Sequence, residues 1–137
     1  MKSPTQLTLA TFRTLGWSVE IVEHWNAHAK IRQDFGGMFD LIAWRPCEGE
    51  RSASLPEPSG GGIVGIQVTD LTHVANRCHK IACNGYAVSW LSAWGRIQVW
   101  GWGLSGRGQI KAIKPRIMVG VEESGRVEWE ERRYVGE

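Results

Sequence analysis

The segment Ile63–Thr69 (IVGIQVT) is nearly apolar throughout and rich in β-branched residues. Such a run predicts a strand near the centre of a sheet, with both faces buried. The segment that follows at once, Leu71–Cys83, has apolar residues at helical spacing and carries His73, Arg77 and Lys80 on its opposite face. A buried strand followed directly by an amphipathic helix leads us to expect a mixed α/β domain.

One domain accounts for the whole chain, because 137 residues are about the length of a single globular domain. The other predicted elements are a helix that has Ser3-Pro4 as its cap and first turn and stops at Gly16, strands over 17–25, 39–44, 86–91 and 96–102, and a closing hairpin of 110–121 and 127–129. The expected order is α-β-β-β-α-β-β in a single domain 1–137, with a C-terminal β extension over 110–137. The segment 47–62, rich in Glu, Ser, Pro and Gly, is interpreted as a mobile loop.

Targeting signals and cysteine patterns point to no special compartment. The start of the chain lacks the apolar core of a signal peptide, and no run approaches the ~18 apolar residues that span a bilayer. Cys47, Cys78 and Cys83 are odd in number and form no CxxC pair, which argues against a disulfide scaffold and against a zinc site. We therefore expect a cytoplasmic protein with no membrane partner.

The net charge of +2 hides an uneven distribution. Residues 1–70 hold six basic and eight acidic residues, whereas residues 71–121 hold seven basic residues and no acidic one. Cations interleaved with tryptophans favour a phosphate backbone as the partner. The candidate nucleic-acid-binding residues are Arg32, Arg77, Lys80, Arg96, Arg107, Lys111 and Lys114. For Trp100 and Trp102, which alternate with glycines, we favour a place in the core or in a dimer interface.

Asp40 and Gln67 are the residues to which the pattern assigns chemistry. Asp40 heads a predicted strand just after two glycines, and Gln67 shares one face of the next strand with Thr69, because side chains alternate along a strand. If the two strands are antiparallel neighbours, Asp40 and Gln67 lie side by side. Their oxygens then suit a hard cation such as Mg²⁺ or Mn²⁺, which polarises a phosphate and lowers the pKa of a bound water. Two structural interpretations stay open: Asp40 caps a turn, and Asp34 pairs with Arg32.

Three ordered segments of the chain resemble the PD-(D/E)XK nuclease superfamily, in particular its small phage-type and Holliday-junction-resolvase-like members: VEHWNAHAKIRQDFGGMFDLIAW, GIQVT and NRCHKI. The resemblance covers about residues 7 to 100 and implies a restriction-endonuclease-like core. It also implies metal binding by Asp40, by Gln67 at a position where the family has Glu or less often Gln, and by the carbonyl of Val68. The family's lysine corresponds to Thr69, and here the chain departs from the pattern.

Thr69 cannot supply the charge of that lysine, because a hydroxyl has no cationic form. We expect Lys80 or Arg77 to supply the cation from the following helix, and Glu23 to supply a further carboxylate. The predicted catalytic residues are therefore Asp40, Gln67, Glu23 and Lys80.

Three functions stay open. The first is a metal-dependent DNA endonuclease; the resemblance implies branched DNA such as Holliday junctions as a substrate, and a homodimer. The second, which Thr69 favours, is a catalytically inactive nuclease-fold protein that binds nucleic acid or a protein partner. The third is an unrelated α/β interaction module whose tryptophans bury a partner surface. An acidic pair and a cation around a common point would favour cleavage.

Overall fold

The computed structural model describes residues 3–46, 61–105, 109–110 and 115–132. Its helices are α1 (Pro4–Thr14), the 3-10 turn η2 (Leu71–His73), α2 (Val74–Ala82) and α3 (Ala87–Ser92). Its strands are β1 (Ser18–Ile21), β2 (His24–Asn26), β3 (Ile31–Gln33), β4 (Leu41–Arg45), β5 (Gly62–Asp70), β6 (Gly95–Trp102), β7 (Leu104–Ser105), β8 (Gln109–Ile110), β9 (Arg116–Glu123) and β10 (Arg126–Arg132). The expected mixed α/β class is confirmed.

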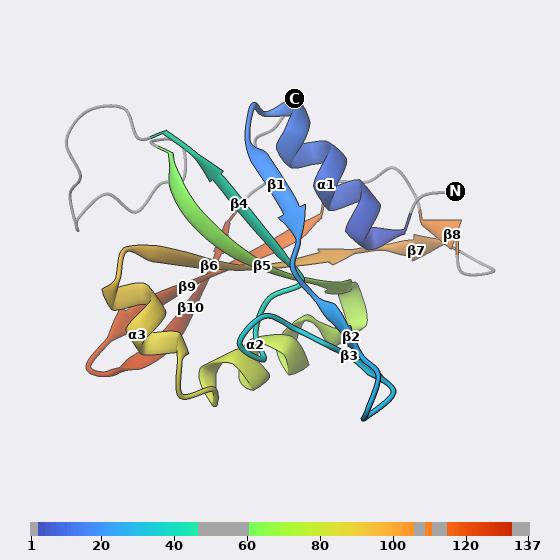
Figure 1. The fold of residues 1–137 in the computed structure, drawn as a ribbon. Helices are drawn as coiled ribbons and strands as arrows, with labels where there is room; N and C mark the ends of the chain where they lie inside the picture. Colours follow the sequence, from blue (N-terminus) through green and yellow to red (C-terminus); the bar gives the residue numbers. More distant parts are fainter. Residues whose placement is uncertain (1–2, 47–60, 106–108, 111–114, 133–137) are drawn as a thin grey trace.

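Six strands form one mixed sheet in the order β1-β4-β5-β6-β9-β10 (Figure 1). Strand β4 runs antiparallel to both of its neighbours, β1 and β5, whereas β6 is parallel to β5 and β9 is antiparallel to β6. The parallel pair is joined through α2 and α3, as parallel neighbours require a long crossover. Two small sheets, β2–β3 and β7–β8, lie outside this one.

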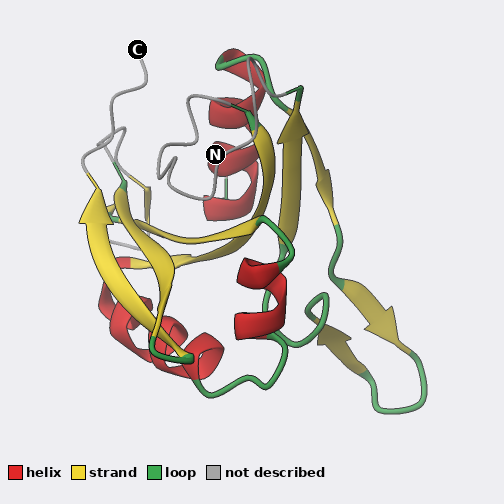
Figure 2. Ribbon diagram, turned by 90° about the vertical axis from the view of Figure 1, so that its left-hand side faces the viewer, coloured by secondary structure: helices red, strands yellow, loops and turns green. Residues whose placement is uncertain are grey.

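The helices cover the two faces of the sheet separately, with α1 on one face and α2 and α3 on the other (Figures 1 and 2). Strand β5 shows the division, because its side chains alternate between the layers. Val64 and Ile66 belong to the core under α1, whereas Gly65 and Gln67 face α2. The prediction of a central strand buried on both faces is confirmed.

Helix α1 is held to the sheet by a buried hydrogen bond as well as by apolar packing. The indole Nε1 of Trp102 donates to Oγ1 of Thr8 at 2.9 Å, and this hydroxyl donates to the Pro4 carbonyl at 2.8 Å. Trp100 and Trp102 are 3% and 5% exposed, which confirms their predicted place in the core. Pairing the indole N–H within the core avoids the cost of an unsatisfied buried donor.

Two glycines let aromatic rings lie directly on the sheet. The ring of Phe39 rests on Gly65 of β5, and the ring of Trp90 rests on Gly95 of β6. Phe39 and Trp90 also contact each other, with ring centroids 5.0 Å apart. Since Phe39 immediately precedes Asp40, this packing fixes the chain where the predicted site begins.

The predicted strand 86–91 is wrong, because this segment forms helix α3. Its apolar residues Ala87, Trp90 and Leu91 follow a helical spacing, and all three pack into the core beneath the sheet. In a six-residue helix this spacing is easily mistaken for a strand.

The predicted strand 17–25 is wrong in its extent. Strand β1 ends at Ile21, where the amides of Val22 and Glu23 turn to donate to the carbonyl of Asp40. The chain then leaves the main sheet, and His24 begins the separate β2–β3 hairpin.

The closing hairpin around Ser124 and Gly125, which both have positive φ, is confirmed as β9 and β10. Its first strand begins at Arg116 and not at Ile110, which belongs to β8, and residues 111–114 lie outside the described part of the chain. Of the predicted mobile loop 47–62, residues 47–60 lie outside the described part of the chain, and Gly62 already belongs to β5. Among the helices that the structure describes, none has the length and apolarity needed to cross a membrane.

Gly65→Ala should destabilise the fold, because the added methyl would overlap the ring of buried Phe39. We expect the free energy of unfolding to fall by about 1–3 kcal/mol, the usual cost of overpacking a core. Gly85→Ala is the matched control, since nothing lies within 4 Å of its added methyl. Urea unfolding measures the free energy of unfolding of both variants. Equal values for Gly65→Ala and Gly85→Ala would contradict this packing.

Candidate metal and nucleic-acid site

Asp40 lies where β4 begins, and its carboxyl turns into the protein. The residue is 8% exposed, and its amide donates to the Ile66 carbonyl of β5 at 2.9 Å. Its Oδ2 accepts hydrogen bonds from the Val68 amide at 2.8 Å and from Nε2 of Gln67 at 2.6 Å. The predicted contact between Asp40 and Gln67 is therefore confirmed.

Glu23 reaches this carboxyl because of the turn that ends β1. The amides of Val22 and Glu23 donate to the Asp40 carbonyl at 2.8 and 3.4 Å, which brings the residue after β1 back to the head of β4. The predicted further carboxylate is thus placed beside Asp40.

Asp34 is the site residue that the sequence interpretation missed. A turn through Gly36 and Gly37, with φ of 62° and 76°, returns the chain from β3 to β4, and a β-bridge between Phe35 and Phe39 closes it. Positive φ at two successive positions suits glycine. The turn places Asp34 next to Asp40. There the carboxylate of Asp34 pairs with Lys80 at 2.8 Å, and not with Arg32, the partner that the sequence interpretation had left open.

Three carboxylates meet as a result. One oxygen each from Glu23, Asp34 and Asp40 lies within 4.8 Å of the other two. Their chain segments follow β1, follow β3 and precede β4, so the cluster exists only when the hairpin and the main sheet are both formed. The glycine pair before Asp40 was the signal that the chain reverses here.

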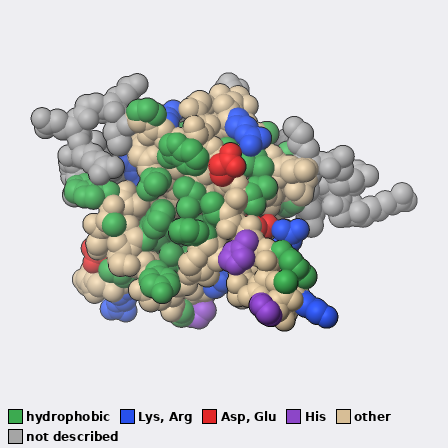
Figure 3. All heavy atoms as spheres, in the orientation of Figure 1, with side chains coloured by type: hydrophobic (Ala, Val, Ile, Leu, Met, Phe, Trp, Pro, Cys, Tyr) green, Lys and Arg blue, Asp and Glu red, His purple; other side chains and the backbone are tan. Residues whose placement is uncertain are grey.

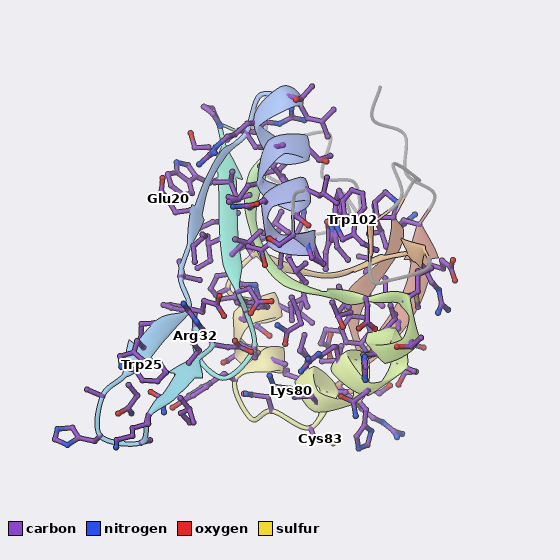
Figure 4. All side chains as sticks on the ribbon, turned by 90° about the vertical axis from the view of Figure 1, so that its right-hand side faces the viewer. Glu20, Trp25, Arg32, Lys80, Cys83 and Trp102 are labelled. Carbon is purple, nitrogen blue, oxygen red and sulfur yellow. The ribbon has the colours of Figure 1, made fainter. Side chains whose placement is uncertain are left out.

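Lys80 brings a cation to the same place from α2. Its Nζ lies 2.8 Å from Asp34 Oδ2 and 3.3 Å from Gln67 Oε1 (Figure 4 labels Lys80 on α2). Gln67 therefore bridges Asp40 and Lys80 through the two ends of its amide. Thr69, where the resemblance leads us to expect a lysine, is only 7% exposed. The helix thus supplies the charge that the strand lacks.

The Val68 amide donates to the Asp40 carboxyl at 2.8 Å, so this amide lies on the side of β5 that faces β4. In a β-strand, the N–H and C=O of one residue point to the same side. The Val68 carbonyl therefore lies on that side as well, and its role as a metal ligand stays a prediction.

The two aspartates have opposite pKa shifts. Burial raises the pKa of Asp40 to about 7 from its ordinary value of 3.8, and the neighbouring Asp34 adds to the rise, although the Val68 amide opposes it. Burial also acts to raise the pKa of Asp34, but the hydrogen bond and charge of Lys80 outweigh it and hold that pKa below 3.8. The closeness of the two carboxyls thus adds to the rise of the Asp40 pKa, whereas Lys80 holds down the pKa of Asp34.

A cavity of about 570 Å³ opens beside the carboxylates, between the β2–β3 hairpin and α2. Its lining residues are His24, Arg32, Gln33, Asp34, Gly36, Gly37, Arg77 and Lys80. Basic groups dominate this wall, and Nε of Arg77 is buried with no hydrogen-bond partner in the described structure. The predicted residues Arg32, Arg77 and Lys80 are therefore brought together.

The other predicted basic residues do not join this cavity. Arg96 lies toward the start of β6, where its guanidinium donates to the Gly61 carbonyl at 2.8 Å. Arg116, a further cation of the stretch 71–121 that was not among the candidate nucleic-acid-binding residues, lies on β9 and pairs with Glu131 at 3.1 Å. Arg107, Lys111 and Lys114 lie outside the described residues. The basic stretch 71–121 is thus divided in space, although it is continuous in sequence.

Comparison with known proteins places the chain in no group. No family model matches it, and no curated protein and no solved structure is significantly similar to it. The interpretation of the site therefore rests on its own geometry.

Asp40→Asn removes the ionisation of the buried carboxyl and should alter how stability depends on pH. A raised pKa in the folded state means that folding takes up a proton, so the carboxyl contributes stability below its unfolded pKa that is lost as pH rises through about 7. The wild-type free energy of unfolding should therefore fall relative to that of Asp40→Asn between about pH 4 and about pH 8. Urea unfolding at several pH values measures the difference.

Glu128→Gln provides the control, because Glu128 is an exposed carboxyl on β10. The free energy of unfolding of Glu128→Gln should change with pH in the same way as that of the wild type. If the difference in the free energy of unfolding between the wild type and Asp40→Asn stays constant with pH, this result would contradict the raised pKa of Asp40.

Proposed function

We propose that the protein is a metal-dependent DNA endonuclease that hydrolyses phosphodiester bonds. The observation that carries the proposal is the meeting of Glu23, Asp34 and Asp40 with the ammonium of Lys80, beside a cavity lined by basic groups. An acidic cluster with a cation at its edge is the arrangement that metal-assisted phosphoryl chemistry needs.

The carboxylates fit a magnesium or manganese ion. Ligand distances of about 2.1 Å put opposite oxygens of an octahedron about 4.2 Å apart. The three carboxylate oxygens lie within 4.8 Å of one another, so small side-chain movements suffice for them to converge on one ion. The Val68 carbonyl adds a fourth oxygen donor on the same side. Hard oxygen ligands of this kind favour Mg²⁺ over softer metals.

Each residue of the candidate site has its own role in this proposal. Asp40, with Asp34 and Glu23, holds the ion, which when bound polarises the phosphate and lowers the pKa of a water. Lys80 stabilises the negative charge that develops on the phosphate oxygens. Gln67 positions both groups, since its amide joins the Asp40 carboxyl to the Lys80 ammonium.

The strand arrangement supports the restriction-endonuclease-like core that the PD-(D/E)XK resemblance implies. Helix α1 precedes the antiparallel strands β1, β4 and β5, and α2 leads to the parallel strand β6. Asp40 and Gln67 occupy neighbouring strands of this core, where the resemblance expects the metal-binding pair. We also propose branched DNA as the substrate and a homodimer as the active form, and these two points rest on the resemblance alone.

A second candidate is a protein of the same fold that binds nucleic acid without cutting it. The buried Thr69 favours it, because it stands where the resembled family carries a lysine. The ion pair of Lys80 with Asp34 favours the nuclease instead, since it shows a cation already held at the carboxylates.

Asp40→Asn should abolish cleavage of DNA in Mg²⁺ or Mn²⁺, because it removes the central carboxylate. Lys80→Ala should slow cleavage by roughly 10²- to 10³-fold, the usual effect of losing one group that stabilises transition-state charge. Arg126→Ala, which removes an exposed cation on β10, is the matched control and should cleave at the wild-type rate. Linear, single-stranded and four-way-junction DNA serve as substrates.

Chelation by EDTA should stop the reaction in the same assay. Cleavage that survives both EDTA and Asp40→Asn would contradict the metal mechanism. DNA binding by the wild type with no cleavage of any substrate in Mg²⁺ or Mn²⁺ would favour the second candidate.

A further inference from the structure

The β2–β3 hairpin projects from the body of the protein beside the carboxylates (Figures 1 and 4). Each of its strands has three residues, and the side chain of Asn26 stabilises the connection by accepting from the amides of His28 and Ala29. Asn26 also donates to Gln33 across the hairpin at 3.2 Å. The hairpin is therefore an ordered element that reaches away from the main sheet.

Trp25 is the most unusual residue of this hairpin. It is 58% exposed and lies directly opposite Arg32, while Ile31 is 51% exposed. A short two-stranded hairpin is marginally stable and would gain from burying an indole. The indole is instead presented to solvent, across the hairpin from Arg32, which lines the basic cavity.

Charge selects the partner of this surface. Residues 24–33 contain no acidic residue, and their basic and histidine side chains are His24, His28, Lys30 and Arg32. Figure 3 shows histidine, basic and hydrophobic side chains gathered over the hairpin. Across the cavity, Arg77 adds a guanidinium whose Nε is unpaired in the described structure. Asp34, which also lines the cavity, is neutralised by Lys80. An aromatic face among cations complements a polyanion that exposes flat rings.

Unpaired DNA presents such rings, and a continuous duplex does not. In a duplex the faces of the bases are stacked on one another, whereas in a single strand each base can stack on an aromatic side chain. Stacking needs no sequence readout, because every base has a π-face.

We propose that the hairpin and the cavity hold a single-stranded segment of DNA, with one unpaired base stacked on Trp25 and the adjoining phosphates held by Arg32 and Arg77. This inference rests on the proposed function, because the held strand leads to the carboxylates at Asp40. The substrate class is thus DNA with unpaired nucleotides next to the bond that is cut.

The test measures binding alone, in EDTA, so that it does not depend on cleavage. Fluorescence anisotropy with labelled oligodeoxythymidine and with a duplex of equal length compares the wild type, Trp25→Ala, Trp25→Phe and Trp44→Ala. Trp44 is the matched control: it is 43% exposed and lies near the far end of β4 from Asp40.

Trp25→Ala should weaken single-strand binding by about 5- to 150-fold, the usual effect of losing one stacked base. Duplex binding should be nearly unchanged, Trp25→Phe should retain most of the single-strand affinity, and Trp44→Ala should match the wild type. Equal single-strand affinity of Trp25→Ala and wild type would overturn the proposal, as would equal losses on both probes or no binding by the wild type.

A second readout locates the stacked base. The wild type should quench the fluorescence of 2-aminopurine at one position of a single strand, and Trp25→Ala should not; quenching that survives Trp25→Ala would overturn the stacking contact. A protein that passes these binding tests but never cleaves DNA in Mg²⁺ or Mn²⁺ would contradict the nuclease, whereas one that cleaves but fails them would contradict the single-strand site.

Discussion

The burial of the Asp40 carboxyl is the constraint on which the site and much of the fold depend. Through its backbone the residue joins β5 and the turn after β1, and through its side chain it accepts from Gln67 and the Val68 amide. A carboxyl withdrawn from water needs such donors, and the main-chain register of β4 against β5 supplies them. The group assigned to metal binding is therefore also a structural group, and its environment is set by the same hydrogen bonds that align the strands.

The fold was predictable where a single segment carries its own signal. The apolar run 63–69 and the amphipathic helix after it show their periods locally, and both were found as expected. The segment 86–91 failed, because six residues with four apolar positions fit a helix and a strand about equally well. A tertiary contact decides for the helix, because the ring of Trp90 packs on the bare backbone of Gly95. This contact cannot be recognised from the sequence around either residue.

The candidate site, like the fold, was predictable only in the part that local sequence patterns determine. The neighbouring positions of Asp40 and Gln67 follow from strand alternation and one antiparallel pairing. Asp34 and Lys80 are 46 positions apart, and their contact depends on a hairpin with strands too short to show a period. Its exposed Trp25 continues the alternation of Trp17, Val19 and Ile21, and for this reason the predicted strand 17–25 runs into the hairpin. A surface aromatic residue and a core residue look alike until the fold shows which side they face.

The hydrogen bond between Thr8 and Trp102 joins positions 94 apart and has a consequence for synthesis. Helix α1 precedes its core partners, which lie on β1, β5 and β6, so it leaves the ribosome before them. Part of its apolar face thus stays uncovered until β6 has been made, and a nascent chain in this state is prone to aggregation. The capping box at Ser3 and Gln6 stabilises the helix locally in the meantime. This core cannot close during translation before β9 is complete, because Ile117 and Val119 of β9 belong to it together with Leu9 and Phe12 of α1.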